Sequence, residues 1–388
     1  MISRRKLLGG ATAAAAVTGA GVVGSRSMDG FAPSGAAAAT MPLKVVNNSG
    51  EFRNESVFLY VLGEVGGQRT WVTAGGEAKT VGLGDNIAEG FTDYAIPLSE
   101  AGNLRLPHMA GGRIYVSLGG KLKFKAVQDG NGKASLAYPA GWVEGDPNYP
   151  VLHDCAEFTF TEAGFFCNTT AVDMFSVPLS ISLKGQKQQT TGRLKPGGRR
   201  KAFEALADGP FNGLIVEDRR IIAPGHGLDA GKFPGNYLDA YIDEVWNVYT
   251  GKDLTVTTGQ GEFKGRVNGT ALTLTGPGTV TIEKPTTRDV LFCDGALAAP
   301  NDQLGGPVAA VIGAALNRTT LAAEDRQPVM DPARFYQGNT VHKYVKAMHE
   351  ITEDGKAYGF AFDDVAGHAS YIEDNAPTEL TLTLDPMD

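Results

Sequence analysis

One stretch of the chain carries two carboxylates in a setting suited to acid–base chemistry. Glu157 lies in residues 155–161, where apolar and polar side chains alternate as in a half-buried strand. Thr159 and Thr161 share the face of Glu157, so the three side chains form a polar row around one carboxylate. Sixteen residues further on, Asp173 stands among apolar neighbours.

Two carboxylates on a rigid sheet, one of them among apolar groups, suit the hydrolysis of a glycosidic bond. One carboxyl group must stay protonated to give its proton to the leaving oxygen, and the other must stay ionised to activate water. Two unrelated strand acids, one of them satisfied by a neighbouring arginine, would show the same pattern. On these residues alone, both interpretations stand.

The spacing of the two acids sets a geometric condition. In a regular hairpin turning about Ala163 and Gly164, Glu157 would face Thr170, and Asp173 would lie about 10 Å further along the strand, on the opposite face. An inverting pair of carboxyl groups needs a separation of about 6.5–9.5 Å, with both groups facing the cleft. A bulge before Asp173, or a loop in place of strict pairing, would meet this condition.

Other residue types give no competing chemistry. The six histidines include no HExxH pattern, and no GxSxG motif is present, so we expect neither a metal site nor a cofactor nor a serine nucleophile. Cys155 and Cys167 flank the turn, but regular pairing would hold them too far apart for a disulfide. We expect these two cysteines and Cys293 to be free thiols packed as small hydrophobic groups.

The first 39 residues have the composition of an export signal. Arg4 and Arg5 precede a weakly hydrophobic segment rich in Gly and Ala, and residues 3–8 resemble the twin-arginine signal. An ordinary secretory signal and an uncleaved membrane anchor are the alternatives. We expect cleavage after about Ala39 and a secreted protein that has no membrane association once processed.

The amino-acid composition limits the classes of molecule that the protein could bind. The chain has 388 residues, of which 42% are hydrophobic and 20% charged, with a net charge of −8. An acidic chain without a run of Lys and Arg argues against nucleic acid or an anionic membrane as the partner, because both require clustered positive charge. We expect a monomer, and the length allows one large or two ordinary domains.

The elements that would position these acids are mainly strands. Short apolar segments separated by Gly, Asn and Asp turns fill residues 43–190 and predict a sandwich or barrel, with strands that include 57–62, 112–118 and 121–124. Helical periodicity follows at 199–206, 237–249, 308–316 and 340–351, with strands between at 279–282 and 290–293. The alternating segment at 379–384 is expected to rejoin the first sheet.

Three parts follow from this pattern. We expect a signal peptide over 1–39, a β-sandwich or barrel domain over 40–185 completed by 375–388, and a mixed α/β domain over 186–374. The fold class is therefore mainly β with a mixed α/β part.

Several motifs together resemble glycoside hydrolase family 64, bacterial endo-β-1,3-glucanases related in fold to thaumatin-like proteins. In the predicted β domain the motifs lie at 45–50, 57–63, 112–119, 157–159 and 168–175. The likeness continues at 237–243, 292–295, 362–365 and 382–386. It spans essentially the whole chain after the signal peptide.

The resemblance implies an enzyme that hydrolyses β-1,3-glucan with inversion, some members of the family releasing mainly the pentasaccharide laminaripentaose. It implies a thaumatin-like β-sandwich or barrel domain packed on an α/β domain, with a cleft between them. Glu157 would then be the general acid and Asp173 the general base. No metal or organic cofactor is expected.

Four further residues are expected to contact the glucan. The resemblance indicates Thr159 and Thr170, the polar row adds Thr161, and Phe166 could stack on a sugar ring, with core packing as its alternative role. Two other functions remain: a non-catalytic thaumatin-like protein that binds β-glucan or acts against fungi, and an enzyme of the same fold that cleaves another β-linked glucan.

Overall fold

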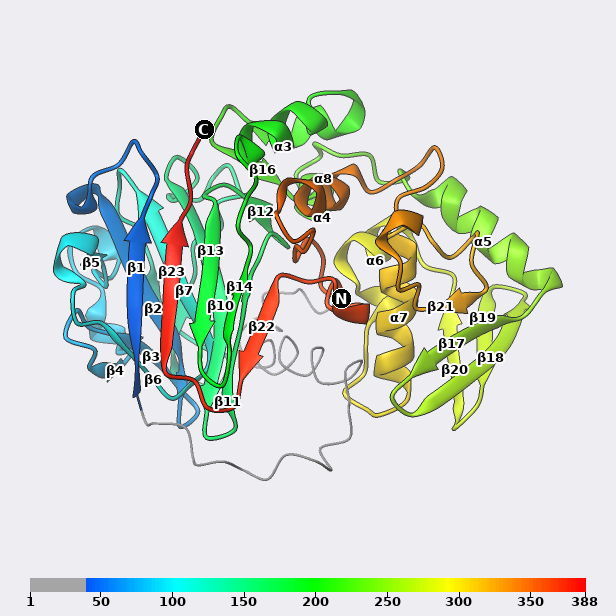
Figure 1. The fold of residues 1–388 in the computed structure, drawn as a ribbon, viewed down its shortest axis with the longest axis horizontal. Coiled ribbons are helices and arrows are strands. Elements are labelled where there is room, and N and C mark those ends of the chain that lie inside the picture. The colour runs from blue at the N-terminus through cyan, green and yellow to red at the C-terminus, as the bar shows by residue number, and fades with distance from the viewer. Residues whose placement is uncertain (1–39) are drawn as a thin grey trace.

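The computed structural model describes residues 40–388, so the predicted twin-arginine signal, residues 1–39, lies outside the described residues. The fold is mainly β with several helices (Figure 1). Two large sheets occupy one half of the molecule, and helices with a third, five-stranded sheet occupy the other. We call these halves the β region, residues 40–191 and 371–388, and the α/β region, residues 198–368.

The β region contains a five-stranded and an eight-stranded sheet. The first has the order β14 (Gln188–Thr191), β13 (Leu179–Lys184), β23 (Glu379–Leu384), β1 (Thr40–Asn47) and β6 (Arg105–Pro107). The second has the order β22 (Tyr371–Asp374), β11 (Gly164–Thr169), β10 (Leu152–Thr161), β7 (Met109–Leu118), β2 (Val57–Val65), β3 (Gln68–Val72) and β4 (Ala78–Thr80), with β5 (Ile96–Pro97) beside β2. A separate hairpin joins β8 (Lys125–Gln128) and β9 (Ala134–Ala137).

One hydrophobic core lies between these two sheets. Phe158 and Phe160 of β10 face Ile181 of β13 and Leu382 of β23 across it, and all four side chains are buried. Burying a side chain of this size contributes about 1.5–3 kcal/mol, so the alternation along β10 fixes which face turns inward. The polar row of Glu157 therefore lies on the outer face.

A smaller cluster covers part of that outer face. Tyr60 of β2 and Tyr115 of β7 pack there with Phe124, and the Tyr60 hydroxyl accepts a hydrogen bond from Leu122 N at 2.7 Å. The cluster covers β2 and β7, while β10 and β11 lie at the end of the sheet nearer the α/β region (Figure 1).

The α/β region has its own sheet and most of the helices. The sheet has the order β20 (Thr279–Glu283), β19 (Ala271–Thr275), β18 (Gly261–Asn268), β17 (Leu254–Thr258) and β21 (Arg326–Gln327). The helices are α3 (Gly198–Leu206), α4 (Pro224–Asp229), α5 (Asp239–Gly251), α6 (Thr287–Phe292), α7 (Gly305–Asn317) and α8 (Lys343–Ile351).

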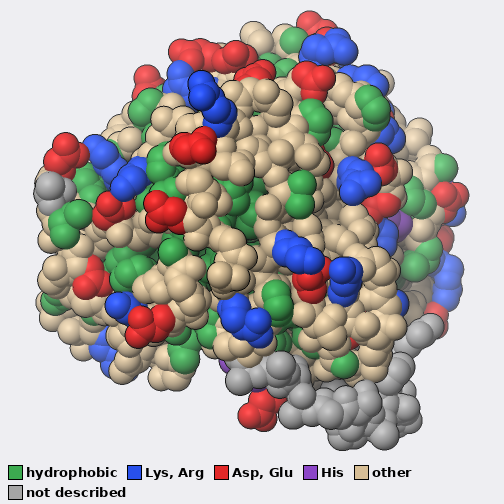
Figure 2. Space-filling model, turned by 60° about the vertical axis from the view of Figure 1, so that its left-hand side comes forward, with side chains coloured by type: hydrophobic (Ala, Val, Ile, Leu, Met, Phe, Trp, Pro, Cys, Tyr) green, Lys and Arg blue, Asp and Glu red, His purple; other side chains and the backbone are tan. Residues whose placement is uncertain are grey.

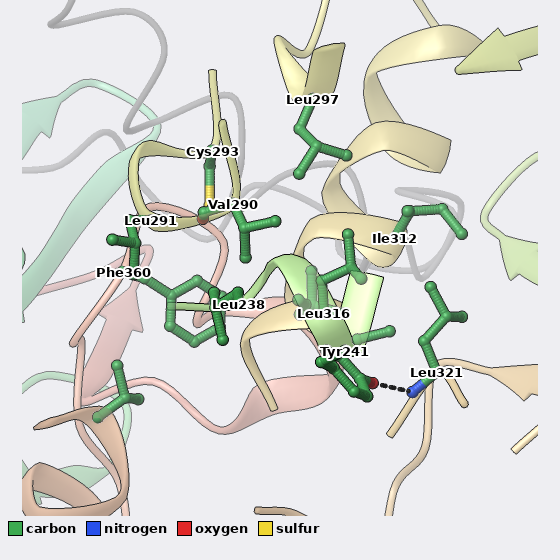
Figure 3. Close-up of a cluster of buried hydrophobic side chains, with 14 of the residues drawn as sticks. Leu238, Tyr241, Val290, Leu291, Cys293, Leu297, Ile312, Leu316, Leu321 and Phe360 are labelled. Atoms are coloured by element: carbon green, nitrogen blue, oxygen red, sulfur yellow. Dashed lines mark hydrogen bonds between the residues drawn. The ribbon is translucent and has the colours of Figure 1, made fainter. Parts of the chain in front are cut away.

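A second hydrophobic core fills this region (Figure 3). Helix α7 is buried on nearly every side and contributes Ile312 and Leu316. Tyr241 of α5 lies in the same cluster, and its hydroxyl accepts a hydrogen bond from Leu321 N at 3.0 Å. The buried hydroxyl is thus satisfied by backbone, as burial of a polar group requires.

A short three-stranded sheet ties the two regions together. It has the order β12 (Met174–Phe175), β16 (Arg220–Ile222) and β15 (Ile215–Val216). Strand β12 follows the strands of the β region in sequence, yet it pairs with β16 of the α/β region, Met174 opposite Ile222. Asp173, which directly precedes β12, is therefore attached to the α/β region.

Most of the predicted elements are confirmed, and two are wrong. The four predicted helices correspond to α3, α5, α7 and α8, and the last strand, β23, pairs with β1 and β13. The predicted strand at 290–293 is instead helix α6, because Thr286 and Asp289 form a capping box that starts a helix. Residues 121–124 precede β8 and are not a strand.

The domain limits differ slightly from the expected ones. Residue 185 falls inside the hairpin of β13 and β14, so the β region continues to residue 191. Strand β22 pairs with β11 in the eight-stranded sheet, although it begins before residue 375. Each limit differs from the expected one by a few residues, because the hydrogen-bonded ladder of β13 and β14 continues beyond residue 185 and that of β11 and β22 lies before residue 375.

The surface carries both signs of charge. On the face drawn in Figure 2, Lys and Arg side chains are interspersed with Asp and Glu. Within residues 40–388, no helix combines the length and the apolar composition that a bilayer crossing needs.

Candidate active site

Glu157 lies in the middle of β10, and its neighbours on both sides are set by strand register. The ladders pair it with Arg113 of β7 and with Asn168 of β11, and paired residues share a face of the sheet. Arg113 Nε and Nη2 donate to Glu157 Oε1 at 3.1 and 3.0 Å. The Glu157 side chain is 24% exposed, so solvent or a ligand can reach it.

Arg113 is itself held by two aromatic residues. Its Nη1 donates to the Tyr115 hydroxyl at 3.3 Å, and its guanidinium carbon lies 5.6 Å from the centre of the Tyr138 ring. The Tyr115 oxygen first, and then the carboxylates of Glu157 and Asp173, raise the pKa of Arg113, against the opposing effect of burial. Arg113 therefore stays charged, and both acids act on it.

Asp173 is held differently, in an irregular segment. Strand β11 ends at Thr169, and the chain runs through residues 170–173 without strand pairing. The backbone oxygen of Asp173 accepts a hydrogen bond from Ala223 N at 3.0 Å, and its Oδ1 lies 2.6 Å from His226 Nε2. The side chain of Asp173 is 46% exposed.

The imidazole of His226, on helix α4, sits between two aromatic rings. It stacks on Trp142 with 4.5 Å between ring centres, and the ring of Phe292 meets it edge-on at 5.6 Å. The side chain of His226 is 15% exposed. A largely buried imidazole therefore contacts a half-exposed carboxylate.

Cys155 lies on the same face of β10 as Glu157. Burial raises the pKa of the Cys155 thiol; Arg113 opposes this, and Glu157, Asp154 and Asp173 add to it. Cys155 and Thr170, which are close in sequence to Glu157 and Asp173 respectively, line the same cavity, so β10 and the loop that carries Asp173 lie beside each other.

The regular-hairpin register considered above is wrong, and the physical reason is the turn. The turn consists of two residues, Glu162 and Ala163, so Glu157 pairs with Asn168 and not with Thr170. The loop at residues 170–173, rather than a continued strand, carries Asp173.

The cysteines are free, as predicted. Cys167 pairs with Phe158 in the β10–β11 ladder and is buried on the core face, whereas Cys155 lies on the opposite face with Glu157. Side chains on opposite faces of a sheet cannot meet in a disulfide.

The four residues expected to contact substrate lie on or beside this face. Thr159 is buried, pairs with Phe166 across the ladder, and accepts a hydrogen bond from Gly111 N at 3.4 Å; Phe166 is half-buried. The Thr161 hydroxyl accepts from the backbone within the turn, and that of Thr170 accepts from the backbone within the loop, so both hydroxyls already have a local partner.

A small cavity lies between the two regions, and some of its lining residues are close to Glu157 and Asp173 in sequence. Its volume is about 50 Å³, and it is lined by Cys155 and Thr170 on one side and by Met348, Ile351 and Tyr358 on the other, among others. This volume has room for water rather than for a sugar ring. Within the described part of the chain, no three His, Cys, Asp or Glu side chains are grouped so as to hold a metal ion.

Three residues of the site, Arg113, Trp142 and His226, were not predicted from the sequence. Arg113 lies in the predicted strand at 112–118. Its charge indicates that it needs an acidic partner, and Glu157, on the polar face of another predicted strand, was a candidate. Trp142 and His226 come from loops and a short helix far away in sequence, and the only local signal is the pair of glycines around His226.

Comparisons with known proteins identify the family of the chain. A family model described as β-1,3-glucanase, glycoside hydrolase family 64, matches residues 39–384. The chain belongs to glycoside hydrolase family 64. It is therefore a glycoside hydrolase, which sets aside the non-catalytic alternative. Glucan endo-1,3-beta-glucosidases from Cellulosimicrobium cellulans and from Arthrobacter sp. (strain YCWD3) are each 36% identical to it over 374 residues, 92% of this chain and 67% of the relative.

Solved structures show the same fold as this glycoside hydrolase. A laminaripentaose-producing β-1,3-glucanase in complex with laminaritetraose is 36% identical, with a TM-score of 0.82 over 91% of this chain and 100% of the other. A β-1,3-glucanase domain of the family from Clostridium beijerinckii is 26% identical, with a TM-score of 0.82 over 90% of this chain and 99% of the other. The mainly β fold with helices is therefore that of the family.

Proposed function

We propose that this enzyme is a secreted endo-β-1,3-glucanase that hydrolyses glucans of the curdlan and laminarin type with inversion, releasing laminaripentaose. The observation that carries the proposal is the pair of partly exposed carboxylates, Glu157 held by Arg113 and Asp173 held by His226. Family membership and the laminaritetraose complex of a 36% identical relative support the choice of substrate. The two sheets of the β region would then form the thaumatin-like sandwich of the family.

Glu157 is the general acid in this mechanism. Arg113 binds one carboxyl oxygen, Oε1, through both of its contacts, so the proton to be transferred is carried on the other oxygen, Oε2. As the glycosidic bond breaks, this proton passes to the leaving oxygen. A carboxyl group fixed by an arginine and by strand register needs no rearrangement at that moment.

Asp173 is the general base. Its ionised carboxylate removes a proton from a water molecule while the water oxygen attacks the anomeric carbon from the face opposite the leaving group. The new C–O bond forms as the old one breaks, so a β-linkage gives an α-anomer. At the end of the turnover Asp173 holds a proton and Glu157 is ionised, and exchange with solvent restores both.

The remaining residues of the face position the glucan. Phe166 is half-buried on the same face as Thr159, where its ring can stack on a sugar, and Thr159, Thr161 and Thr170 supply hydroxyl groups near the acids. The twin-arginine signal predicted from residues 3–8 supports export of the enzyme from the cell.

The experiment that tests this function is incubation of the mature protein with laminarin, curdlan and a soluble β-1,4-glucan, followed by sizing of the released sugars. We expect oligosaccharides, with the pentasaccharide dominant, from the two β-1,3-glucans and none from the β-1,4-glucan. Equal cleavage of the β-1,4-glucan would contradict the proposed linkage, and release of glucose alone would contradict endo-action.

A further inference from the structure

The mechanism above gives His226 no role, although its imidazole contacts the proposed general base and packs between two aromatic rings. Its Nε2 lies 2.6 Å from Asp173 Oδ1, a short hydrogen bond typical of a charged acceptor. The imidazole is 15% exposed, whereas the carboxylate that it contacts is 46% exposed. One partner is thus fixed in the protein and the other is open to ligand.

Backbone packing fixes the position of His226. Helix α4 starts directly after β16, where Ala223 N donates to the backbone oxygen of Asp173. A Cβ atom at Gly225 would lie 3.0 Å from the Phe292 ring, and one at Gly227 would lie 2.1 Å from Leu214 Cδ2. The glycines on both sides of His226 therefore allow the helix to pack more closely than any other residue would permit.

The ring planes are fixed as well. Trp142 stacks on one face of the imidazole, and Phe292 meets it edge-on. The loop that carries Trp142 is held in turn by Arg220, a fully buried residue of β16 whose Nη1 donates to Gly141 O at 2.6 Å. The same strand thus anchors the Trp142 loop and leads directly into the helix that carries His226.

We propose that His226 is the positioning residue of Asp173: it donates its Nε2–H to Oδ1, orients the carboxylate toward the attacking water and favours its ionised form. This inference rests on the proposed role of Asp173 as the general base. A hydrogen bond donated to the charged form of an acid stabilises that form, and a fixed donor saves the orientation that a mobile carboxylate would need.

Other ionisable groups surround this pair and stay unchanged in the test. Arg113 of β7, Cys155 of β10 and Tyr344 of α8 interact electrostatically with Asp173. On the side of His226, Arg288 of α6 lies over the Phe292 ring and pairs with Asp229 at the end of α4.

Three variants of His226 separate the effect of the hydrogen bond from that of the packing. His226→Phe keeps a ring between Trp142 and Phe292 but removes the donor. His226→Gln keeps an N–H group at a similar reach, whereas His226→Asn carries the same amide one methylene shorter. The Gln and Asn pair keeps the test available if the Phe variant does not fold, which the melting temperature of each variant shows.

The readouts are kcat, KM and the pH profile of laminarin hydrolysis. We expect His226→Phe and His226→Asn to lower kcat about 10–100-fold, as loss of a partner that orients a reactive group does, to leave KM within about 2-fold, and to move the acidic limb of the kcat/KM profile to higher pH. His226→Gln should recover part of both effects. A wild-type limb and kcat in His226→Phe, or equal losses in Gln and Asn with no shift of the limb, would overturn the inference.

Asp173→Asn with azide separates failure of this inference from failure of the proposed function. Near-wild-type activity of Asp173→Asn would refute the role of Asp173 itself, whatever His226 does. If Asp173→Asn is inactive and azide restores turnover, adding His226→Phe should cost nothing further, because no carboxylate remains to be oriented. A further loss as large as in the wild-type background, or azide rescue of a His226 variant instead, would contradict the positioning role.

Discussion

The two carboxylates of the site are held by different kinds of structure. Glu157 lies in a regular ladder, where register places Arg113 and Asn168 on either side of it. Asp173 lies in a loop between strands, and a backbone bond to Ala223 and the His226 side chain, both from the α/β region, hold it. The acid is thus fixed by the β region alone, whereas the position of the base depends on how the two regions meet.

Each region has an apolar core, and each also buries carboxylates, such as Asp154 in β10 and Asp363 in the α/β region. The core between the two large sheets is made of apolar side chains such as Phe160 and Leu382. The α/β region encloses Asp363, fully buried, which accepts hydrogen bonds from Arg318 Nη2 at 3.0 Å, from His349 Nε2 at 3.0 Å and from Gly359 N at 2.9 Å. Apolar burial tolerates small changes, but a buried charge depends on every partner.

The largest effect is expected at the acid. Glu157→Gln should lower laminarin hydrolysis by about 10²–10⁴-fold with an unchanged melting temperature, because a carboxamide cannot deliver the proton. The matched control is Glu162→Gln, an exposed glutamate in the turn of the same hairpin, which should keep full activity. Comparable activity of the two variants would remove Glu157 from the mechanism.

The next largest effect is a loss of stability caused by a substitution in the α/β region. Asp363→Asn leaves the guanidinium of Arg318 buried without its counter-charge, which should cost about 3–5 kcal/mol in the free energy of unfolding measured in urea. The exposed pair of Arg326 and Glu262 gives the control, since Glu262→Gln should cost less than about 1 kcal/mol. Equal costs would show that the buried network does not hold this region.

A smaller effect on the free energy of unfolding is expected when the pH is lowered. Burial lowers the pKa of His342 from its ordinary 6.5 to about 4, and its Nδ1 accepts a hydrogen bond from Val345 N at the start of α8. The unfolded chain binds the proton more readily between these values, so this stability is complete above pH 6.5 and is lost as the pH falls toward 4.

His342→Asn tests this pH dependence, because asparagine keeps an acceptor at the start of the helix but does not titrate. Between pH 7 and 4.5, the variant should lose about 2 kcal/mol less of its free energy of unfolding than the wild type. The pKa of His349 is raised in the folded protein, which gives the opposite slope, but His349 is present in both proteins and cancels from the comparison. Parallel pH curves would contradict this role of His342.

The same contrast explains what the sequence could and could not predict. The face of β10 that carries Glu157 follows from a period of two, which any half-buried strand shows. Helices α5 and α7 follow from their apolar periodicity. The partners of Glu157 come from ladders between distant segments, and no local pattern encodes the register of such ladders.

The setting of Asp173 was harder to predict, for the same physical reason. The pairing of β12 with β16 decides where Asp173 points, and these strands are separated by more than forty residues. His226 comes from that distant segment too, so it had no visible link to an acid. Helix α6 was different, since the capping box of Thr286 and Asp289 was a local signal that could have been read.

The central claim, that Glu157 and Asp173 act together in a single displacement, is tested most directly by the anomeric form of the first product. Proton NMR of a laminarin oligosaccharide digest, recorded before mutarotation, should show the α-anomer as the initial product of the wild-type enzyme. Appearance of the β-anomer first would contradict the account, because it would require a covalent intermediate and two carboxyl groups only about 5 Å apart.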